Sequence, residues 1–447
     1  MSAPSRVSVA VLSWNGRHHL ETCLAALEEQ ADPGVPWEVL VLDNGSTDGT
    51  VPWLEKHYGR HPRVRWIESP VNLGFCAGNN RLAAEARGDA IALLNNDTRP
   101  EPGWLAALVD ALAAAPDDVA AVSGKIVDWE GEHLDFGRGV MTFDGHAFQL
   151  DFRRPLSKAR VPRGGEELLF ACGGNMLVRR ESFLAAGGFD ESYFAYLEDV
   201  DLGWRLWSGG ERVVFAPDAV VRHRSSATSD LLGNYNRGFL FERNAYLTVY
   251  KNYEAGLWER LMPAVMLTLL TRTQTLLLEN NPGTGTLRLD PYSGWIANTA
   301  PAAAPPAVPV TLPPPRPLTP AGLAARWKEY GTRDLAARGW RKLKQRVLPP
   351  PSPAAPEPPR LTDERTIAQF RVLTNLIGHL DRAARSRESI QRRRRRSDRE
   401  IFDRFPLYLV PTYPGDDPLF ANPAFTTWLP DDLPIVRAKL EEVMEAG

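Results

Sequence analysis

The segment "WEVLVLDNGS" (37–46) decides the fold, because it joins a buried strand directly to a polar turn. Its apolar run, 39–42, is short and aliphatic, which is typical of a strand covered on both faces. Asp43 follows at once, and Asn44 and Gly45 are residues that tight turns favour. The segment therefore predicts a strand that carries a carboxylate at its end.

Three further segments repeat this strand-and-turn pattern, namely "VSVAVLSW" (7–14), "VRWIESP" (64–70) and "DAIALLNND" (89–97). Helical patterns lie between them, and "GFCAGNNRLAAEA" (74–86) is one of these helices. Short apolar strands that alternate with helices predict an α/β fold with a mostly parallel sheet. Ligands of such sheets bind beyond the carboxyl ends of the strands, where the polar residues 14–15, 43–44 and 95–97 are expected.

The bulk composition is that of a soluble globular protein, with 43% hydrophobic and 24% charged residues. A length of 447 residues suffices for two or three domains. The formal net charge of −3 argues against nucleic acid as a partner, because nucleic-acid binders usually carry a strong basic excess. Cys23, Cys76 and Cys172 lack metal-ligand spacing, so we expect reduced core cysteines in a cytosolic protein.

Two apolar segments fall short of a membrane or secretion signal. "MSAPSRVSVAVLSWNG" (1–16) has an apolar run too short for a signal peptide. "LMPAVMLTLLTRTQTLLL" (261–278) is broken by Pro263 and Arg272, whereas a membrane helix needs about 20 apolar residues. We expect a core or interfacial helix there. The protein is expected to be cytoplasmic, and peripheral contact with the inner face of the cell membrane is left open.

The segment "FAYLEDVDLGWRL" (194–206) holds three carboxylates within four positions, beside aromatic and apolar residues. Burial of an unpaired carboxylate is costly, so Glu198, Asp199 and Asp201 need either solvent or a role. Taken alone, the cluster is a solvated capping segment. Asp201 falls in the first turn of the predicted helix, where the dipole favours negative charge, and we expect a structural role for it.

Other polar positions also have two interpretations. Asp43 is either a turn residue or an acceptor for a nucleotide held over the sheet. Asp97 at the end of its strand can ligate a hard cation together with a substrate diphosphate. The small residues before "MLVRR" (176–180), Gly173 and Gly174, form either a tight turn or a close approach to a sugar. Four histidines without a partner pattern are expected at the surface: His18, His19, His57 and His61.

Three nucleotide-binding classes are excluded by the loop after the first strand. A dinucleotide-binding oxidoreductase needs G-x-G-x-x-G there, and the sequence reads "SWNGRHHL" (13–20). The phosphate-binding loop G-x-x-x-x-G-K-[ST] is absent as well. A nucleotidyltransferase would need a glycine-rich loop with a basic residue, and this loop has neither three glycines nor a lysine.

The ordered motifs of residues 5–245 resemble the family 2 glycosyltransferases of the GT-A fold. They are "VAVLSWNG", "LVLDNGSTDGT", "NLGFCAGNN", "ALLNNDT", "GGNMLVRRESFLAAGGFDESYFAYLEDVDLGWRL" and "VRH". Within the family the chain looks most like the bacterial enzymes that add rhamnose and related sugars to surface polysaccharides. The resemblance implies an α/β GT-A nucleotide-diphospho-sugar transferase fold, a mostly parallel sheet between helices, followed here by a helical C-terminal region.

The resemblance also implies roles for individual residues. Asp199 matches the catalytic base, with Glu198, Gly174 and Asn175 near the acceptor or supporting the base. Asp97 matches the last carboxylate of the DXD motif, and His223 the histidine that completes a Mg²⁺ or Mn²⁺ site. The residues implied for nucleotide-sugar binding are Ser13, Asn15, Asp43, Asn72, Asn80 and Asn96. Asn95 and Asn96 stand where many relatives have Asp, and an amide is the weaker ligand.

The implied reaction is an inverting transfer of rhamnose or a similar hexose from a nucleoside-diphosphate-sugar of UDP or dTDP type. A glycan or a polyprenyl-linked saccharide is the implied acceptor. In such a transfer one carboxylate takes the proton of the attacking hydroxyl. The alternative is an inactive GT-A module that only binds nucleotide-sugars or glycans. The retained Asp43, Asp97, Asp199 and His223 argue against that alternative.

Composition divides the chain into four expected parts. They are a GT-A domain (1–250), a helical extension (251–295), proline-rich linkers around a basic helical segment (296–360) and a helical C-terminal region (361–447). The run "RRRRR" (392–396) is either a solvated basic face or a contact for anionic phospholipids or a polyprenyl diphosphate. Nucleic acid is not expected there, because the run has no interleaved aromatic residues.

Overall fold

The computed structural model describes residues 3–224, 234–280 and 363–444. The predicted proline-rich linkers and the basic segment between them lie outside the described residues. Those described residues that precede residue 277 or follow residue 363 belong to one compact unit.

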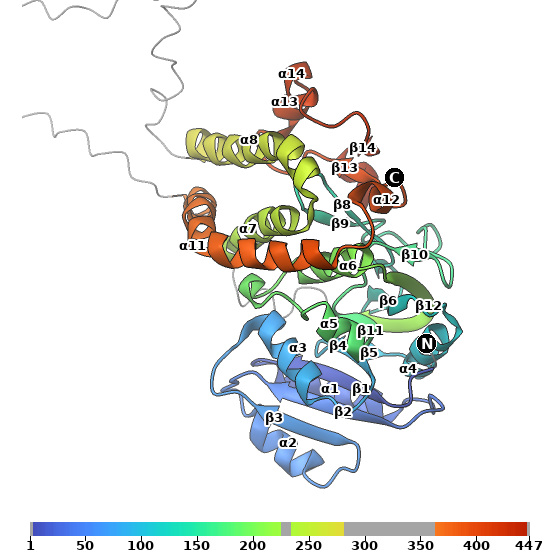
Figure 1. Cartoon of the computed structure of the whole chain (residues 1–447). Coiled ribbons are helices and arrows are strands. Elements are labelled where there is room, and N and C mark those ends of the chain that lie inside the picture. Colours follow the sequence, from blue (N-terminus) through green and yellow to red (C-terminus); the bar gives the residue numbers. More distant parts are fainter. Residues whose placement is uncertain (1–2, 225–233, 281–362, 445–447) are drawn as a thin grey trace, which may run out of the picture. The chain divides into compact units, whose positions relative to one another are not determined.

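A single large sheet runs through this unit, with the strand order β10-β12-β6-β11-β4-β1-β2-β3 (Figure 1). Its strands are β1 (Val7–Ser13), β2 (Trp37–Asp43), β3 (Val64–Glu68), β4 (Ala90–Asn95), β6 (Val119–Asp128), β10 (Glu167–Leu168), β11 (Asn175–Arg179) and β12 (Arg212–His223), with the short β5 (Thr98–Pro100) and β7 (Leu134–Phe136) at its side. Strands β3, β2, β1 and β4 are mutually parallel, and β6 is parallel to β12. Strand β11 runs antiparallel between β4 and β6. The expected α/β fold with a mostly parallel sheet is confirmed.

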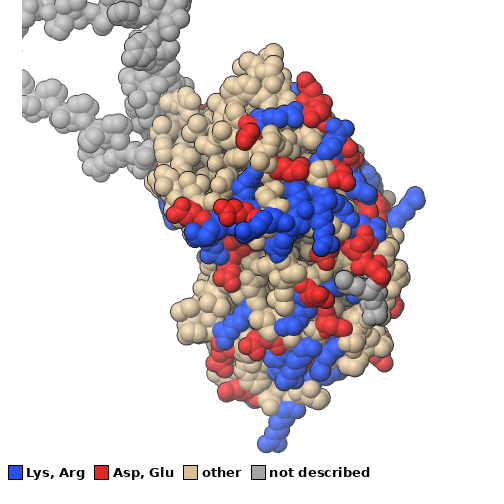
Figure 2. All heavy atoms as spheres, in the orientation of Figure 1, with Lys and Arg blue, Asp and Glu red and all other residues tan. Residues whose placement is uncertain are grey.

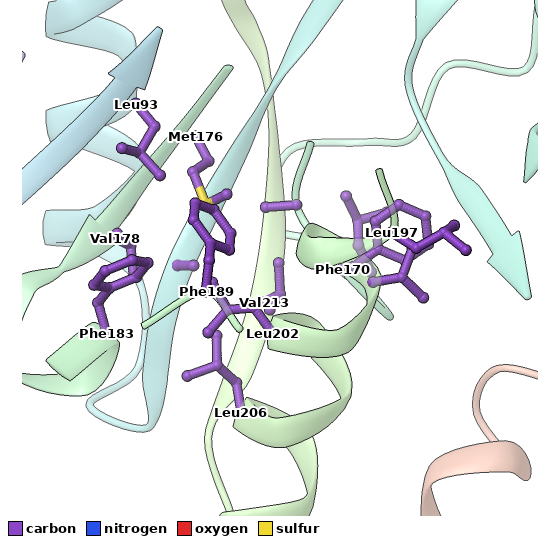
Figure 3. Close-up of a cluster of buried hydrophobic side chains, with 14 of the residues drawn as sticks. Leu93, Phe170, Met176, Val178, Phe183, Phe189, Leu197, Leu202, Leu206 and Val213 are labelled. Atoms are coloured by element: carbon purple, nitrogen blue, oxygen red, sulfur yellow. The ribbon is translucent and has the colours of Figure 1, made fainter. Parts of the chain in front are cut away.

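The helices of the first 208 residues pack on this sheet. They are α1 (Arg17–Glu28), α2 (Thr50–Tyr58), α3 (Gly74–Glu85), α4 (Trp104–Ala114), α5 (Arg180–Ala185) and α6 (Glu198–Ser208). Helix α3 contacts β1 and β2, α4 contacts β6, β11 and β12, and α6 contacts β12. Figure 3 shows Leu202 and Leu206 of α6 on the side that faces Phe189 and Val213. This apolar face fixes α6, and with it the acidic start of the helix, on the sheet.

The later helices pack against the same unit. They are α7 (Asn234–Asn252), α8 (Ala255–Asn280), α11 (Glu364–Arg393), α12 (Asp398–Phe402), α13 (Asp416–Phe420), α14 (Pro423–Thr426) and α15 (Leu440–Met444); β8 (Gly139–Met141) pairs with β9 (Ala147–Gln149), and β13 (Leu407–Leu409) with β14 (Ile435–Arg437). Helix α11 lies along α7 and also contacts α6, as Figure 1 shows. The expected helical C-terminal region is present.

Helix α8 is the one helix in the described part of the chain whose length and composition would allow it to cross a membrane. This is weak evidence for a span, and 44% of its apolar window is buried inside the protein. Its Arg272 is 2% exposed and contacts Asp416 Oδ1 at 2.8 Å and Asp144 Oδ2 at 2.9 Å. That side of α8 therefore faces the protein interior, as expected of a core helix.

Candidate active site

A cavity of about 310 Å³ opens at the carboxyl edge of the parallel strands, in front of the start of α6. Its lining joins residues from five strand ends, from the start of α3 and from the segment before α6. The lining residues are Leu12, Trp14, Asn44, Asn72, Gly74, Phe75, Asn95, Asn96, Asp97, Cys172, Gly173, Gly174, Phe194, Ala195, Tyr196, Glu198, Asp199 and His223. The edge expected from the sequence is therefore where the cavity lies.

Strand register explains why these polar residues meet. Ser13 stands opposite Asp43, and the residue before Ser13 stands opposite Asn95. Asn96 then donates from Nδ2 to Ser13 Oγ over 3.1 Å. Asp43 is 3% exposed and accepts the Ser46 N–H at 3.1 Å, while its Oδ1 has no partner among the described residues. Neither Ser13 nor Asp43 lines the cavity itself, but an unpaired buried oxygen such as Asp43 Oδ1 can accept a hydrogen bond from a ligand.

The predicted nucleotide-binding asparagines take three different positions. Asn72 lines the cavity, where its Oδ1 accepts hydrogen bonds from Asn44 Nδ2 at 2.9 Å and from Gly74 N–H at 2.8 Å. Asn15 turns away and accepts the Thr47 N–H at 2.8 Å. Asn80 donates from Nδ2 to the Phe189 carbonyl and accepts the Phe189 N–H at Oδ1, both at 2.8 Å. It lies outside the cavity lining. The structure thus uses Asn15 and Asn80 to hold neighbouring loops.

His223 and Asp97 form one corner of the cavity. His223 Nε2 lies 3.4 Å from Asp97 Oδ1, and its Nδ1 lies 2.6 Å from Asp135 Oδ2. Burial alone would lower the pKa of His223, but hydrogen bonds to Asp135 and Asp97 outweigh it and raise the pKa to about 10. Asp135, which the sequence did not single out, therefore fixes the ring orientation.

This corner suits a divalent metal ion in its donor chemistry. Asp97 offers a carboxylate, and a histidine whose other ring nitrogen bonds a carboxylate is the usual arrangement of an imidazole ligand. Among the described residues, no group of three or more His, Cys, Asp or Glu side chains is placed to hold a metal ion. A bound ion would therefore draw its remaining ligands from substrate phosphates and water, as Mg²⁺ commonly does.

Glu198 and Asp199 line the opposite side of the cavity. Burial raises the pKa of Glu198 well above its ordinary range, and the charge of Asp199 raises it further. Burial also raises the pKa of Asp199, against the lowering effect of hydrogen bonds from Gly173 N–H at 3.1 Å and Val200 N–H at 2.9 Å. Glu198 Oε2 has no partner among the described residues. Both carboxyl groups of the pair therefore have a raised pKa, and the two backbone N–H groups hold the Asp199 carboxylate in place.

The segment that leads into α6 has an unusual backbone. Phe194, Tyr196 and Leu197 have φ angles of 65°, 71° and 62°. Side chains other than glycine rarely adopt this region, and three such residues in a row of four require support from elsewhere.

Helix α7 supplies this support. The buried Asn244 donates from Nδ2 to the carbonyls of Tyr193, Ala195 and Tyr196 at 3.2, 2.8 and 2.8 Å. Arg243 donates to the Ser192 and Tyr193 carbonyls at 2.8 and 2.9 Å. These two side chains hold the segment before the carboxylate pair.

Glycine is required at position 74 by the same segment. Gly74 has a φ of 81°, and a Cβ there would lie 2.5 Å from the Phe194 ring. The Phe194 carbonyl in turn accepts the N–H groups of Phe75 and Cys76 at the start of α3. The close approach joins the two walls of the cavity.

Two further predictions need correction. Asn175 is fully buried, and its amide bonds Trp104 Nε1 at 2.8 Å and the Lys125 and Ala219 carbonyls at 3.1 Å, so it faces the interior and not an acceptor. Its neighbour Gly174 does line the cavity. His19 is 8% exposed, not a surface residue as expected, because α1 turns it toward the sheet.

Asp201 has the expected structural role, but for a different reason. It is fully buried and contacts Arg205 Nη2 at 2.8 Å, Lys251 Nζ at 3.0 Å and Asn252 Nδ2 at 2.8 Å. Burial opposes ionisation, yet Arg205 and Lys251 lower the pKa of Asp201. It is the anion of a buried ion-pair network, not a solvated charge at a helix end.

The three cysteines are free in the described structure, as expected. Trp14 and Asn44 line the cavity, at the strand ends where the sequence predicted ligand binding. The site residues that sequence reasoning missed are Asp135, Phe194, Arg243 and Asn244. Asp135 and Asn244 carry no local signal, since each acts on a residue about 50 or more positions away.

Comparison with known proteins agrees with this geometry. Residues 8–185 match the family model described as "Glycosyl transferase family 2". The N-acetylglucosaminyl-diphospho-decaprenol L-rhamnosyltransferase of Mycobacterium tuberculosis (strain ATCC 25618 / H37Rv) is 33% identical over 259 residues, which cover 52% of this chain and 82% of that protein. The O-antigen biosynthesis protein RfbC of Myxococcus xanthus is 34% identical over 201 residues, 43% of this chain and 15% of that one.

A solved structure of a mannosyltransferase from Pyrobaculum calidifontis, in complex with GDP-Man and Mn²⁺, is 17% identical with a TM-score of 0.41 and covers 84% of this chain and 87% of that one. The family match and the rhamnosyltransferase relative carry the assignment. The expected resemblance is confirmed, and the protein is a glycosyltransferase. The chain belongs to glycosyl transferase family 2.

Proposed function

We propose that this glycosyltransferase moves rhamnose or a similar hexose, with inversion, from a nucleoside-diphosphate-sugar of UDP or dTDP type to a glycan or polyprenyl-linked saccharide. Support comes from the M. tuberculosis relative, whose name describes transfer of L-rhamnose to a saccharide on a diphospho-decaprenol. The single observation that carries the proposal is the carboxylate pair at the start of α6, which lines the same cavity as Asp97 and His223.

In this proposal Asp199 is the base that takes the proton of the acceptor hydroxyl. Its raised pKa brings it nearer to neutral pH, which suits a group that must gain a proton during the reaction. The N–H groups of Gly173 and Val200 hold the carboxylate in place. The protonated Glu198 donates a hydrogen bond to substrate or to its neighbour, and Gly174 lets the sugar approach the backbone closely.

The donor nucleotide is proposed to lie over the ends of β1 and β2. The unpaired Oδ1 of Asp43 would accept a hydrogen bond from the base or ribose. Asn72 and Asn96 line the path from there to Asp97. Asp97 and His223 would hold Mg²⁺ or Mn²⁺, which when bound offsets charge on the leaving diphosphate.

The Asp199 assignment is tested with two amide variants of nearly unchanged shape. A general base contributes about 10²–10⁴-fold to the rate, so Asp199→Asn should lower transfer by that factor. Affinity for the nucleoside diphosphate should stay unchanged, because the base faces the acceptor. Glu198→Gln is the matched control and should keep most activity, since Glu198 already holds a proton. An active Asp199→Asn beside an inactive Glu198→Gln would assign the base to Glu198 instead.

The metal assignment is tested by thermal shift with a panel of nucleoside diphosphates, with and without Mn²⁺. A ligand that binds the native state raises the melting temperature by mass action. Asp97→Asn should lose most of the Mn²⁺-dependent part of the shift while the protein stays folded. The control is Asp43→Asn, which should weaken the shift equally with and without Mn²⁺. An unchanged Mn²⁺-dependent shift in Asp97→Asn would contradict the assignment.

Peripheral contact with the inner face of the cell membrane is also proposed, on the basis of charge. Figure 2 shows Lys and Arg side chains gathered in a band across one face, over α11. The run 392–396 is divided. Arg394 donates to the Asn252 carbonyl and Arg396 to the Glu211 carbonyl. Arg392, Arg393 and Arg395 are exposed, although Arg393 also donates to the Ala186 carbonyl at 3.3 Å. None of the described arginines of this run lines the main cavity, so their proposed contact is with anionic lipid heads.

A further inference from the structure

A second cavity, of about 590 Å³, adjoins the first one at His223. Its lining comes from the loop between β6 and β7, from residues 152–153 and from the end of β12. The two cavities share the His223 side chain, so a molecule in the second cavity lies next to the first one. Its volume suffices for a ligand of one or two sugar rings.

Two guanidinium groups line this cavity. Arg224 stacks on the Trp129 ring at 4.0 Å, and Arg99 lies on the same ring at 5.1 Å. Arg153 stacks on Phe152 at 5.3 Å. Within the described residues neither Arg224 nor Arg153 makes an ion pair with a carboxylate. A guanidinium held by stacking keeps its N–H edge available for a phosphate.

Two of the three carboxylates in the same lining contact histidine side chains. Asp135 bonds His223 as described above, and Asp128 Oδ2 lies 2.7 Å from His133 Nδ1. Asp128 Oδ1 also accepts the N–H groups of residues 132 and 133. Glu130 is the remaining carboxylate and is exposed. In the described structure no ion pair joins these three carboxylates to Arg153 or Arg224.

A buried polar group in the lining points to a ligand independently of the arginines. His19 is 92% buried, and its Nδ1 has no hydrogen-bond partner among the described residues. Burial lowers the pKa of His19, and the nearby His18 lowers it further. A buried polar atom without a partner costs stability unless a ligand or water satisfies it.

We propose that this second cavity binds the phosphorylated end of the acceptor, a saccharide linked through phosphate or diphosphate, with Arg153 and Arg224 on the phosphate oxygens. The proposal rests on the function proposed above. It makes the chain selective for a sugar phosphate over a neutral glycan. It also lets the saccharide extend past His223 to Asp199, where its hydroxyl reacts.

The experiment measures binding by calorimetry, so that it does not depend on transfer activity. The probe is N-acetylglucosamine 1-phosphate, compared with methyl N-acetylglucosaminide and with inorganic phosphate, all in the presence of a saturating nucleoside diphosphate. The variants are Arg153→Gln, Arg224→Gln and their combination. The matched control is Arg63→Gln, because Arg63 also stacks on a tryptophan, Trp37 at 4.6 Å, and lines neither cavity.

The wild type should bind the sugar phosphate more tightly than either comparison ligand. The double variant should lose affinity for it by about tenfold or more, as expected for lost hydrogen bonds to a charged group. Arg63→Gln should bind like the wild type. Equal binding by the double variant overturns the proposal, and so does inorganic phosphate binding as tightly as the sugar phosphate.

A parallel titration with the nucleoside diphosphate separates donor from acceptor. If the double variant loses affinity for the nucleotide by the same factor, the arginines serve the donor and the proposal is wrong. If the sugar phosphate behaves as expected but no nucleoside-diphosphate-sugar supports transfer, the proposed reaction fails and the binding site stands. The two failures are therefore distinguishable.

Discussion

At the scale of single residues, three neighbouring carboxylates of α6 have three different environments. Glu198 is buried without a cation, Asp199 accepts two backbone N–H groups, and Asp201 contacts two cations. Glu198 and Asp199 line the cavity, whereas Asp201 faces the interior, where it contacts Arg205 and Lys251. Environment, not residue type, separates the proposed base from the structural anion.

Asp201→Asn should lower the stability of the folded state. The change leaves Arg205 and Lys251 buried with one anion fewer, and breaking a buried ion pair typically costs about 3–5 kcal/mol. The measurement is urea unfolding of wild type and variant at pH 7. If Asp201 were only a solvated charge at a helix end, the loss of stability would be smaller, about 0.3–1 kcal/mol.

The pH dependence of this loss provides its control. The pKa of Asp201 is lower in the folded state, so the residue stabilises the fold above its ordinary pKa of 3.8. That contribution disappears as the pH falls through the folded-state pKa. The stability difference between wild type and Asp201→Asn should therefore be full at pH 7 and narrow in acid. If the stability difference between wild type and Asp201→Asn stays constant as the pH falls below 3.8, the ion-pair explanation is contradicted.

At the scale of elements, α7 determines the shape of the segment before α6. Three non-glycine residues with positive φ cost free energy, about 1–3 kcal/mol each, and persist only where surrounding contacts impose them. Asn244 and Arg243 provide these contacts, because their side chains donate hydrogen bonds to backbone carbonyl groups of the segment. Helix α7 is therefore part of the catalytic arrangement, although none of its residues lines the main cavity.

Asn244→Asp should lower kcat more than it affects donor binding. The variant keeps the shape of the side chain but loses the N–H donors to three carbonyls, so the segment before Asp199 relaxes. A displacement of about 1 Å at a reacting group can cost about 10²-fold in rate. Steady-state kinetics and nucleoside-diphosphate affinity are the two measurements.

The control for Asn244→Asp is Thr268→Val, which removes a buried hydroxyl on α8 that bonds only Ala264 of its own helix at 2.8 Å. Its kcat should stay near that of the wild type. If both variants lose stability and kcat alike, Asn244 acts only through general stability. If donor affinity falls as much as kcat, the segment serves the nucleotide and not the base.

At the scale of the whole molecule, the C-terminal region (364–444) packs onto helix α6. Asp398 accepts the Trp204 Nε1–H at 3.1 Å, and Phe402 of α12 contacts the Trp204 ring edge-on at 5.2 Å. Arg272 joins α8 to Asp416 of α13. The region 364–444 therefore stabilises the unit that holds the active site. Removal of this region should therefore impair nucleotide binding.

Phe402→Ala should destabilise the whole compact unit by about 3–5 kcal/mol, because Phe402 is fully buried against Trp204 and Tyr253. Calorimetric unfolding should show one transition at a lower temperature, with and without a nucleoside diphosphate. The control is Ile377→Ala on α11, which is 72% exposed and should change stability by about 0.5 kcal/mol or less. Two separate transitions, with only one moved by Phe402→Ala, would show that the region folds independently.

The sequence by itself determined the alternation of strands and helices in the first half and the edge at which polar residues gather. Period-two and period-3.6 patterns are local, and a turn after each apolar run places Ser13, Asp43 and Asn95 at strand ends whatever the rest of the chain does. The motif order around these ends was enough to identify the family. The pair of Glu198 and Asp199 was also visible as a local cluster.

Tertiary structure alone decided which of these side chains face the cavity. Asn80 and Asn175 resemble binding residues in sequence, but their amides satisfy buried backbone and indole groups. The partners that orient the site come from distant segments: Asp135 bonds His223 over 88 positions, and Asn244 bonds Ala195 over 49. A side-chain hydrogen bond reaches about 3 Å in space regardless of separation along the chain, so only the packed fold selects its partner.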